Sequence, residues 1–191
     1  NNTTAFANTA VGQAALRTNT TGQNNTAVGA TGPLQLNTTG SNNTVVGNSA
    51  MNQNTTGGSN VAIGSSALRL NTTGTANTGV GFQALESAQN VVQVTAVGYQ
   101  ALKDCTASYN TAVGFQALDD CTSGTMNVSV GDGVLSAVTN ESSNTGMGHF
   151  ALNANTASSN SAFGRNSLRN NTSGSNNTAI GATTLTNNTT G

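Results

Sequence analysis

The chain has 191 residues, and six acidic residues against five Lys or Arg give it a formal net charge of −1, with only 6% of residues charged. This near-neutral balance argues against a nucleic-acid partner, and no apolar run approaches the ~18 residues of a membrane-spanning helix. Aromatic residues make up 4% and Trp is absent, so the chain has too few large apolar side chains for a conventional globular core.

One repeat runs through the whole chain. A glycine preceded by an apolar residue, here called the anchor glycine, recurs from Gly12 to Gly181 at intervals of 16 to 18 residues. The consensus around it is Asn-Thr-Ala-Val-Gly-x-x-Ala-Leu-x-x-Asn-Thr-Thr-Gly, and residues 110–118 are one clear copy. Eleven copies indicate a single repeat domain over residues 1–191.

The composition of each copy selects the fold class. Seventeen residues are too few for a helix pair, and the Asn, Thr and Gly residues of every copy are poor helix formers. The sequence therefore predicts an all-β protein, a parallel β-solenoid (β-roll) of about eleven 17-residue coils. We expect two short strands in each coil, one at Asn-Thr-Ala-Val-Gly and one at the Ala-Leu pair, joined by tight turns.

Two columns of the repeat are the predicted core. They are the apolar residue before the anchor glycine and the Leu four residues after it, and stacking the coils turns each into a continuous apolar row. The core residues expected on this basis are Val11, Leu16, Ile63, Leu68, Val97, Leu102, Val113, Leu118, Ile180 and Leu185.

Strand alternation then places the small residues of the first strand on the opposite face from the Val column. Ala112 and Gly114 are one such pair. An outer face of small residues permits another chain to approach closely, which favours a homo-oligomer. The alternative is that this Ala row faces water.

The motif Asn-Thr-Ala-Val-Gly-x-x-Ala-Leu resembles the YadA-like head repeats of trimeric autotransporter adhesins and related repeats of phage tail fibres. The resemblance covers essentially the whole chain, although the adhesin repeats are somewhat shorter. It implies a left-handed roll, side-by-side association of three chains, and an extracellular place on a cell or virion surface. Because the chain begins inside a repeat and finishes on a coil, we also expect a segment of a longer fibre.

The central coils, about residues 86–141, depart from the consensus. They hold all six acidic residues and both cysteines. Five residues after successive anchor glycines, Arg69, Glu86, Lys103 and Asp119 alternate in charge, which predicts a surface salt ladder.

Three sets of residues in this region are candidate sites. Cys105 and Cys121 occupy the same column of adjacent coils, at a separation that permits a disulfide, with two free thiols as the alternative. In a second column, Phe82, Tyr99 and Phe115 predict an exposed aromatic ladder that either holds a surface glycan or receptor or joins chains. Asp104 and Asp120 stack as like charges, but two carboxylates are too few for calcium and His149 is the only histidine, so no metal or other cofactor is predicted.

These features favour a structural protein over an enzyme, because no catalytic constellation occurs. The preferred hypothesis is a fibre or adhesin segment forming a rigid rod on a phage or cell surface. An extracellular filament subunit that stacks end to end is the alternative. An ice-binding solenoid is less favoured, because the strand motif carries one Thr column instead of two.

Overall fold

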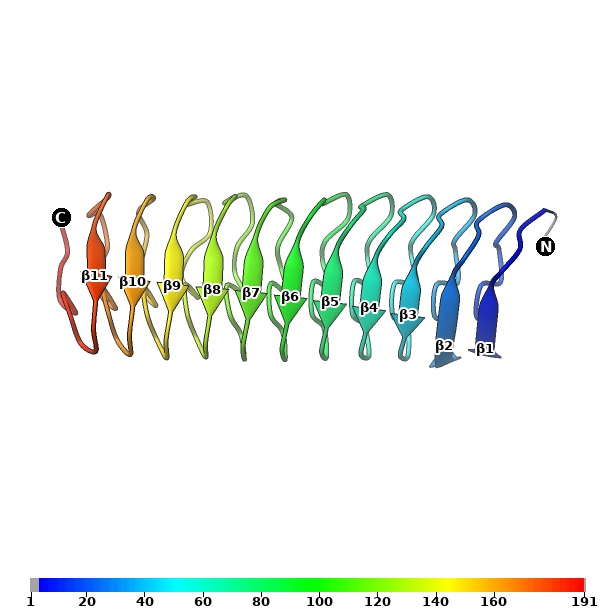
Figure 1. Ribbon diagram of the computed structural model, residues 1–191, viewed down its shortest axis with the longest axis horizontal. Coiled ribbons are helices and arrows are strands. Elements are labelled where there is room, and N and C mark those ends of the chain that lie inside the picture. Colours follow the sequence, from blue (N-terminus) through cyan, green and yellow to red (C-terminus); the bar gives the residue numbers. More distant parts are fainter. Residues whose placement is uncertain (1–3, 191) are drawn as a thin grey trace.

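The computed structural model describes residues 4–190 and consists of a row of stacked coils with one short strand in each (Figure 1). All the strands belong to one parallel sheet whose spatial order follows the chain. The strands are β1 (Thr9–Gln13), β2 (Thr26–Thr31), β3 (Thr44–Val46), β4 (Val61–Ile63), β5 (Thr78–Val80), β6 (Thr95–Val97), β7 (Thr111–Val113), β8 (Val128–Val130), β9 (Thr145–Met147), β10 (Ser161–Phe163) and β11 (Thr178–Ile180).

The coils stack in register, residue over equivalent residue. Thr95, Ala96 and Val97 of β6 pair with the corresponding three residues of β7, and the same pattern continues along the row, with one irregularity between Val11 and Gln13 of β1. The strands stay close to parallel from β1 at one end to β11 at the other (Figure 1). The predicted parallel β-solenoid is therefore confirmed, and its sheet has little twist from one end to the other (Figure 1).

The prediction of a second strand in each coil is wrong for the described coils, because the Ala-Leu segment forms a series of turns. Its backbone enters the left-handed region twice, with φ of 46° at Gln116 and 53° at Leu118. A β-strand needs negative φ throughout. The turns still bond to the next coil, since the Leu118 N–H donates to the Val134 carbonyl at 3.1 Å.

The predicted core is half right. The Leu column is buried: Leu68, Leu102 and Leu118 have no exposed surface. Leu16 is partly buried against the core, and Leu185 is half exposed.

The column before the anchor glycine points outward, contrary to the prediction. Ile63 is 39%, Val113 37% and Ile180 73% exposed; Val11 is also exposed, and Val97 is half-buried. The residue before each of them fills the interior instead. These inward positions are Ala27, Val45, Ala62, Gly79, Ala96, Ala112, Ser129, Gly146, Ala162 and Ala179.

The narrow interior explains why the smaller side chain lies inside. The strand faces the Leu column of the opposite wall so closely that a Cβ on Gly79 would lie 3.3 Å from Leu68 Cδ1. A Cβ on Gly146 would lie 2.5 Å from Val134 Cγ1, so the larger Val134 is matched by a residue without a side chain. The small outer face predicted at Ala112 is therefore wrong, because this Ala is in the core.

The first of two buried asparagine ladders follows the column seven residues after the anchor glycine. Asn54 donates from Nδ2 to Asn37 Oδ1 at 2.7 Å and to the Gly57 carbonyl at 3.0 Å, and it accepts from Asn71 Nδ2 at 2.9 Å. One side chain thus satisfies three buried groups in three coils. The members of this turn ladder are Asn19, Asn37, Asn54 and Asn71, and then Asn155, Asn171 and Asn188.

The second ladder lies at the entry to the strands. The Asn60 backbone N–H donates to Asn43 Oδ1 at 3.0 Å, while Asn60 Nδ2 donates to the Gly74 carbonyl at 2.9 Å. Asn60 Oδ1 accepts from the Asn77 N–H of the following coil at 3.0 Å, and Asn60 Nδ2 also donates to Asn43 Oδ1 of the preceding coil at 3.1 Å, so each side chain bonds both neighbouring coils. Because buried polar groups are costly unless they are hydrogen-bonded, these two ladders are the reason that a chain rich in Asn forms a compact interior.

Asparagine in the turn ladder is followed by glycine three residues later in most coils, although Ser158 follows Asn155. A Cβ on Gly57 would overlap Asn54 Oδ1 and the Gly74 carbonyl oxygen. In the first of the central coils both residues of this pair change together: Ala88 replaces the Asn and Val91 the Gly. The ladder stops there, and Asn71 Oδ1 is buried without a partner.

Replacing Asn54 by Ala removes three hydrogen bonds from the turn ladder. Since each buried group left without a partner costs about 1–3 kcal/mol, we expect Asn54→Ala to lower the free energy of unfolding by at least about 2 kcal/mol, measured by chemical denaturation. Asn48→Ala, at an exposed Asn of the same coil, is the control. Equal losses in the two variants would contradict a structural role for the ladder.

A pair of neighbouring substitutions tests which strand residue lies inside. Ala112→Leu inserts three carbons into a filled interior and is expected to cost about 1–3 kcal/mol or more. Val113→Leu changes an outward residue and is expected to change the unfolding midpoint little. The reverse order would mean that the Val column is the core.

Candidate functional site

The outward side of the sheet, here called the strand face, presents two parallel rows. The first row is mostly threonine and the second is apolar. The first contains Thr9, Thr26, Thr44, Val61, Thr78, Thr95, Thr111, Val128, Thr145, Ser161 and Thr178, and the second Val11, Val28, Val46, Ile63, Val80, Val97, Val113, Val130, Met147, Phe163 and Ile180.

No charged residue occurs in any of the described strands, and every Lys, Arg, Asp and Glu of the chain lies outside them. With strands 4.8 Å apart, the two rows cover a strip roughly 50 Å by 10 Å, on the order of 500 Å². Apolar patches on a monomer that reach a few hundred Å² are often functional. The strand face, with its continuous apolar row, is therefore a candidate interaction surface.

The predicted aromatic ladder is present at the turn that follows the strands. Phe82 and Tyr99 stack with ring centroids 5.4 Å apart, and Tyr99 and Phe115 stack at 5.2 Å with an interplanar angle of 8°. All three rings are exposed. Beside them Gln116 donates to Gln100 at 3.2 Å, so an amide ladder supports the aromatic one.

The predicted salt ladder forms in part. Arg69 Nε lies 2.7 Å from Glu86 Oε1, in adjacent coils, as the alternation requires. Lys103, however, lies 3.8 Å from Asp104 of its own coil, and the described residues show no ion pair between Lys103 and Asp119. The central carboxylates are therefore less well compensated than their alternation with basic residues suggested.

A hollow of about 610 Å³ lies across the coils that begin at Gly114, Gly131 and Gly148. Its middle coil contributes only short side chains, whereas the coils on either side carry Phe115 and Phe150. This acidic notch is lined by Phe115, Gln116, Asp119, Asp120, Asp132, Gly133, Ser136, Ala137, Phe150, Asn153 and Ala154.

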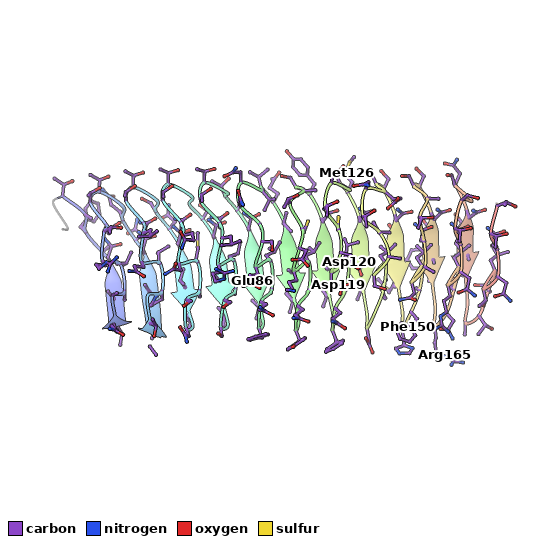
Figure 2. The ribbon with its side chains drawn as sticks, turned by 180° about the vertical axis from the view of Figure 1, so that it is seen from behind. Glu86, Asp119, Asp120, Met126, Phe150 and Arg165 are labelled. Carbon is purple, nitrogen blue, oxygen red and sulfur yellow. The ribbon has the colours of Figure 1, made fainter. Side chains whose placement is uncertain are left out.

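Gly133 creates the notch. Its position in the two preceding coils is held by Gln100 and Gln116, so the glycine interrupts the amide ladder. Phe150, at the same position of the next coil, leans over the gap, because a Cβ on Gly133 would lie 2.6 Å from Phe150 Cδ1. Figure 2 shows Asp119 and Asp120 on the back of the rod and Phe150 nearer the lower edge.

Asp119 is the most perturbed carboxyl group of the described residues. Burial and, after it, repulsion from Asp120 and Asp104 raise the pKa of Asp119 to about 6, against a smaller opposing effect of Lys103. Its Oδ1 atom is buried and has no hydrogen-bond partner.

Cys105 and Cys121 are buried free thiols in adjacent coils. Asn110 Nδ2 lies 3.7 Å from Cys105 Sγ and 4.0 Å from Cys121 Sγ, so one amide spans both sulfurs. Their mutual hydrogen bond lowers the pKa of Cys105 and, together with burial, raises the pKa of Cys121. A disulfide between them stays a prediction.

Within residues 4–190, no three His, Cys, Asp or Glu side chains are grouped as metal ligands. Over the same residues, no helix has the length and apolar character needed to span a membrane.

Sequence reasoning found the aromatic ladder and the central acids but missed the notch. The signal for the notch was Gly133, which lies two residues after the anchor glycine Gly131. Aligning successive coils shows that a side chain is missing at this position. The strand face was also missed, because its apolar row was assigned to the core.

Comparisons with known proteins leave the family open: no family model matches the chain, and neither a curated protein nor a solved structure matches it significantly.

The raised pKa of Asp119 predicts a specific pH dependence of stability. The pKa of Asp119 is 3.8 in the unfolded chain and about 6 in the folded protein. Between these two pH values the folded state binds more protons than the unfolded state, so the free energy of unfolding falls as the pH rises. We expect Asp119→Asn to raise the thermal midpoint at pH 7 and to leave it almost unchanged at pH 4. Parallel pH profiles of the variant and the wild-type protein would contradict this.

Proposed function

We propose that this chain is a non-catalytic structural segment of an extracellular fibre or adhesin, on a cell or virion surface, in which copies of the chain associate side by side, most simply as a trimer. The observation that carries the proposal is the strand face: a flat strip of exposed apolar and threonine side chains without a single charge. Further copies of the chain supply the same surface, so that bringing the strips of three copies together along a common axis removes apolar area from water on all of them.

Three further features support a fibre. The in-register stack is quasi-one-dimensional, so its length grows with the number of coils while its cross-section stays constant. The backbone hydrogen bonds between coils run along the rod, as in the bonds from Leu68 to Ala84 and from Leu85 to Ala101. The repeat motif itself resembles those of trimeric adhesin heads and phage tail fibres.

The depletion of charge supports an interface in particular. Protein–protein interfaces are poor in charged residues at their centre, whereas a solvated sheet face commonly carries Lys or Glu, which also prevents edge and face association. Here the charged residues lie only in the turns.

The test combines solution mass with charge substitutions on the strand face. One chain has a mass of 18.9 kDa, and light scattering on the wild-type protein is expected to give three times that value. Val97→Lys combined with Val113→Lys places two charges at the centre of the apolar row and is expected to yield monomers that keep the β-rich circular dichroism spectrum.

The matched control is Gln93→Lys combined with Tyr109→Lys, which adds the same charge to the same two coils at exposed turn positions. This variant is expected to stay assembled. A monomeric wild-type protein would overturn the proposal, and dissociation of both variants would remove the strand face as the interface. Particles that lengthen with concentration would favour an end-to-end filament instead.

One observation keeps an ice-binding function as the second candidate: the threonine row is regular along most of the strands and faces outward, half-buried in the middle coils and exposed at Thr9, Thr44 and Thr178. It lies beside an apolar row, not beside a second threonine row. Thermal hysteresis at micromolar protein would support this candidate, and its absence would exclude it.

A further inference from the structure

The acidic notch differs from the rest of the surface in shape. Along most of the aromatic ladder each ring has a neighbour in the next coil, but the stack ends at Phe115, because Asp132 occupies the next position. Phe115 is 50% exposed, and its free side adjoins the hollow. The volume of about 610 Å³ lies within the range of small-molecule sites, about 300–1,000 Å³.

The polar groups of the notch that remain free are acceptors. Asn153 already uses both hydrogens of its amide, donating to the Gly133 carbonyl at 2.8 Å and to Ser136 Oγ at 2.6 Å. Gln116 donates from Nε2 to Gln100. What these two side chains still offer a ligand is mainly their amide oxygens, so the notch calls for a ligand with many donors.

The negative charge of the notch also favours a ligand that carries hydrogen-bond donors and a positive charge. Asp119, Asp120 and Asp132 line it, and no Lys or Arg does. Asp119 is half-buried, and its buried Oδ1 atom has no hydrogen-bond partner, so the chain itself compensates this carboxylate poorly.

The charged groups around the notch are largely occupied with one another. Lys103 lies beside Asp104 at 3.8 Å, and His149 Nε2 lies 3.6 Å from Asp132 Oδ2. Arg169 lies over the Phe150 ring at 5.1 Å from its centroid. The last contact also shows that the Phe150 ring accepts a cation on its face.

We propose that the acidic notch binds an amino sugar with a free ammonium group. The sugar hydroxyls donate to the amide and carboxylate oxygens of Gln116, Asn153 and Asp120, its C–H face packs against the free side of Phe115, and the ammonium group donates to Asp119. A saccharide fits better than a lysine side chain, because one ammonium supplies three donors, fewer than the acceptors present, and an alkyl chain leaves much of the volume empty.

This inference is independent of the proposed assembly. The notch is built from turn residues of three coils of one chain, none of which belongs to the strand face. The proposed oligomer can prove wrong while the notch still binds its ligand, and the notch can fail to bind while the oligomer forms.

The test is calorimetric titration with the trisaccharide of glucosamine and, as the neutral counterpart, its fully N-acetylated form. The wild-type protein is expected to bind the amino form at least tenfold more tightly. Asp119→Asn is expected to weaken binding of the amino form about tenfold or more. Asp104→Asn, which removes an acid outside the lining, is expected to leave the affinity within about twofold.

Gly133→Gln supplies an independent variant. It extends the amide ladder with a residue that Gln100 and Gln116 place in the same left-handed backbone, and it displaces the Phe150 side chain that leans over Gly133. The variant is expected to fill the hollow and to abolish binding while the circular dichroism spectrum is retained. Between pH 7 and pH 5, protonation of Asp119, whose pKa is about 6, is expected to lower the affinity of the wild-type protein relative to that of Asp119→Asn, whose side chain does not titrate and which therefore reports the effect of pH on the ligand alone.

Four results would overturn the inference: no binding of the amino trisaccharide at millimolar concentration, equal affinity for the acetylated form, an equal loss in Asp104→Asn and Asp119→Asn, or retained binding in Gly133→Gln. Tighter binding of a tri-lysine peptide than of the amino trisaccharide would assign the notch to a peptide and also reject the saccharide.

Discussion

The structure depends on the in-register stacking of equivalent residues, because most buried asparagine side chains find a hydrogen-bond partner one coil away. Asn54 joins three coils through a single amide, and the strand-entry ladder bonds the backbone of Asn60 to the side chain of Asn43. A slip of one residue would leave amides buried without partners at every coil, so the ladders fix the register more strictly than apolar contacts alone would. The same ladders account for the flatness of the sheet, since untwisted sheets are typically held by such side-chain stacks.

The narrow interior decides what the rod presents to its surroundings. Leu residues from the turn wall occupy the space opposite the strand, so the inward strand position is Ala, Gly or Ser in all the coils from β2 onward except that of Val45. The larger residue of each strand is therefore placed outside, where it joins a row of threonines to form an uncharged strip. Assembly and core packing are thus linked, because the constraint that keeps Ala inside is the one that exposes the Val column.

Departures from the repeat occur in the central coils, where residues that constrain one another in the other coils are replaced. Ala88 with Val91 replaces an Asn–Gly pair, and the turn ladder stops without a steric conflict. Three coils further on, Gly133 removes one side chain from the amide ladder, and the consequence is a hollow bordered by two rings and three carboxylates. In a strictly periodic surface, one missing side chain is sufficient to create a pocket, since the neighbouring coils cannot move in to fill it without losing register.

The sequence by itself determined the solenoid, the coil length, the buried Leu column and the stacked rings of Phe82, Tyr99 and Phe115, because each is a property of spacing and in-register repetition. Only the tertiary structure decided which strand residue faces inward: alternation places Ala112 and Val113 on opposite sides, but the thickness of the interior determines which side is the core. It also replaced the expected second strand with left-handed turns, at Leu118 for example, since these conformations are imposed by bonds to the next coil. The notch likewise follows from three coils packed together, which no single copy of the repeat contains.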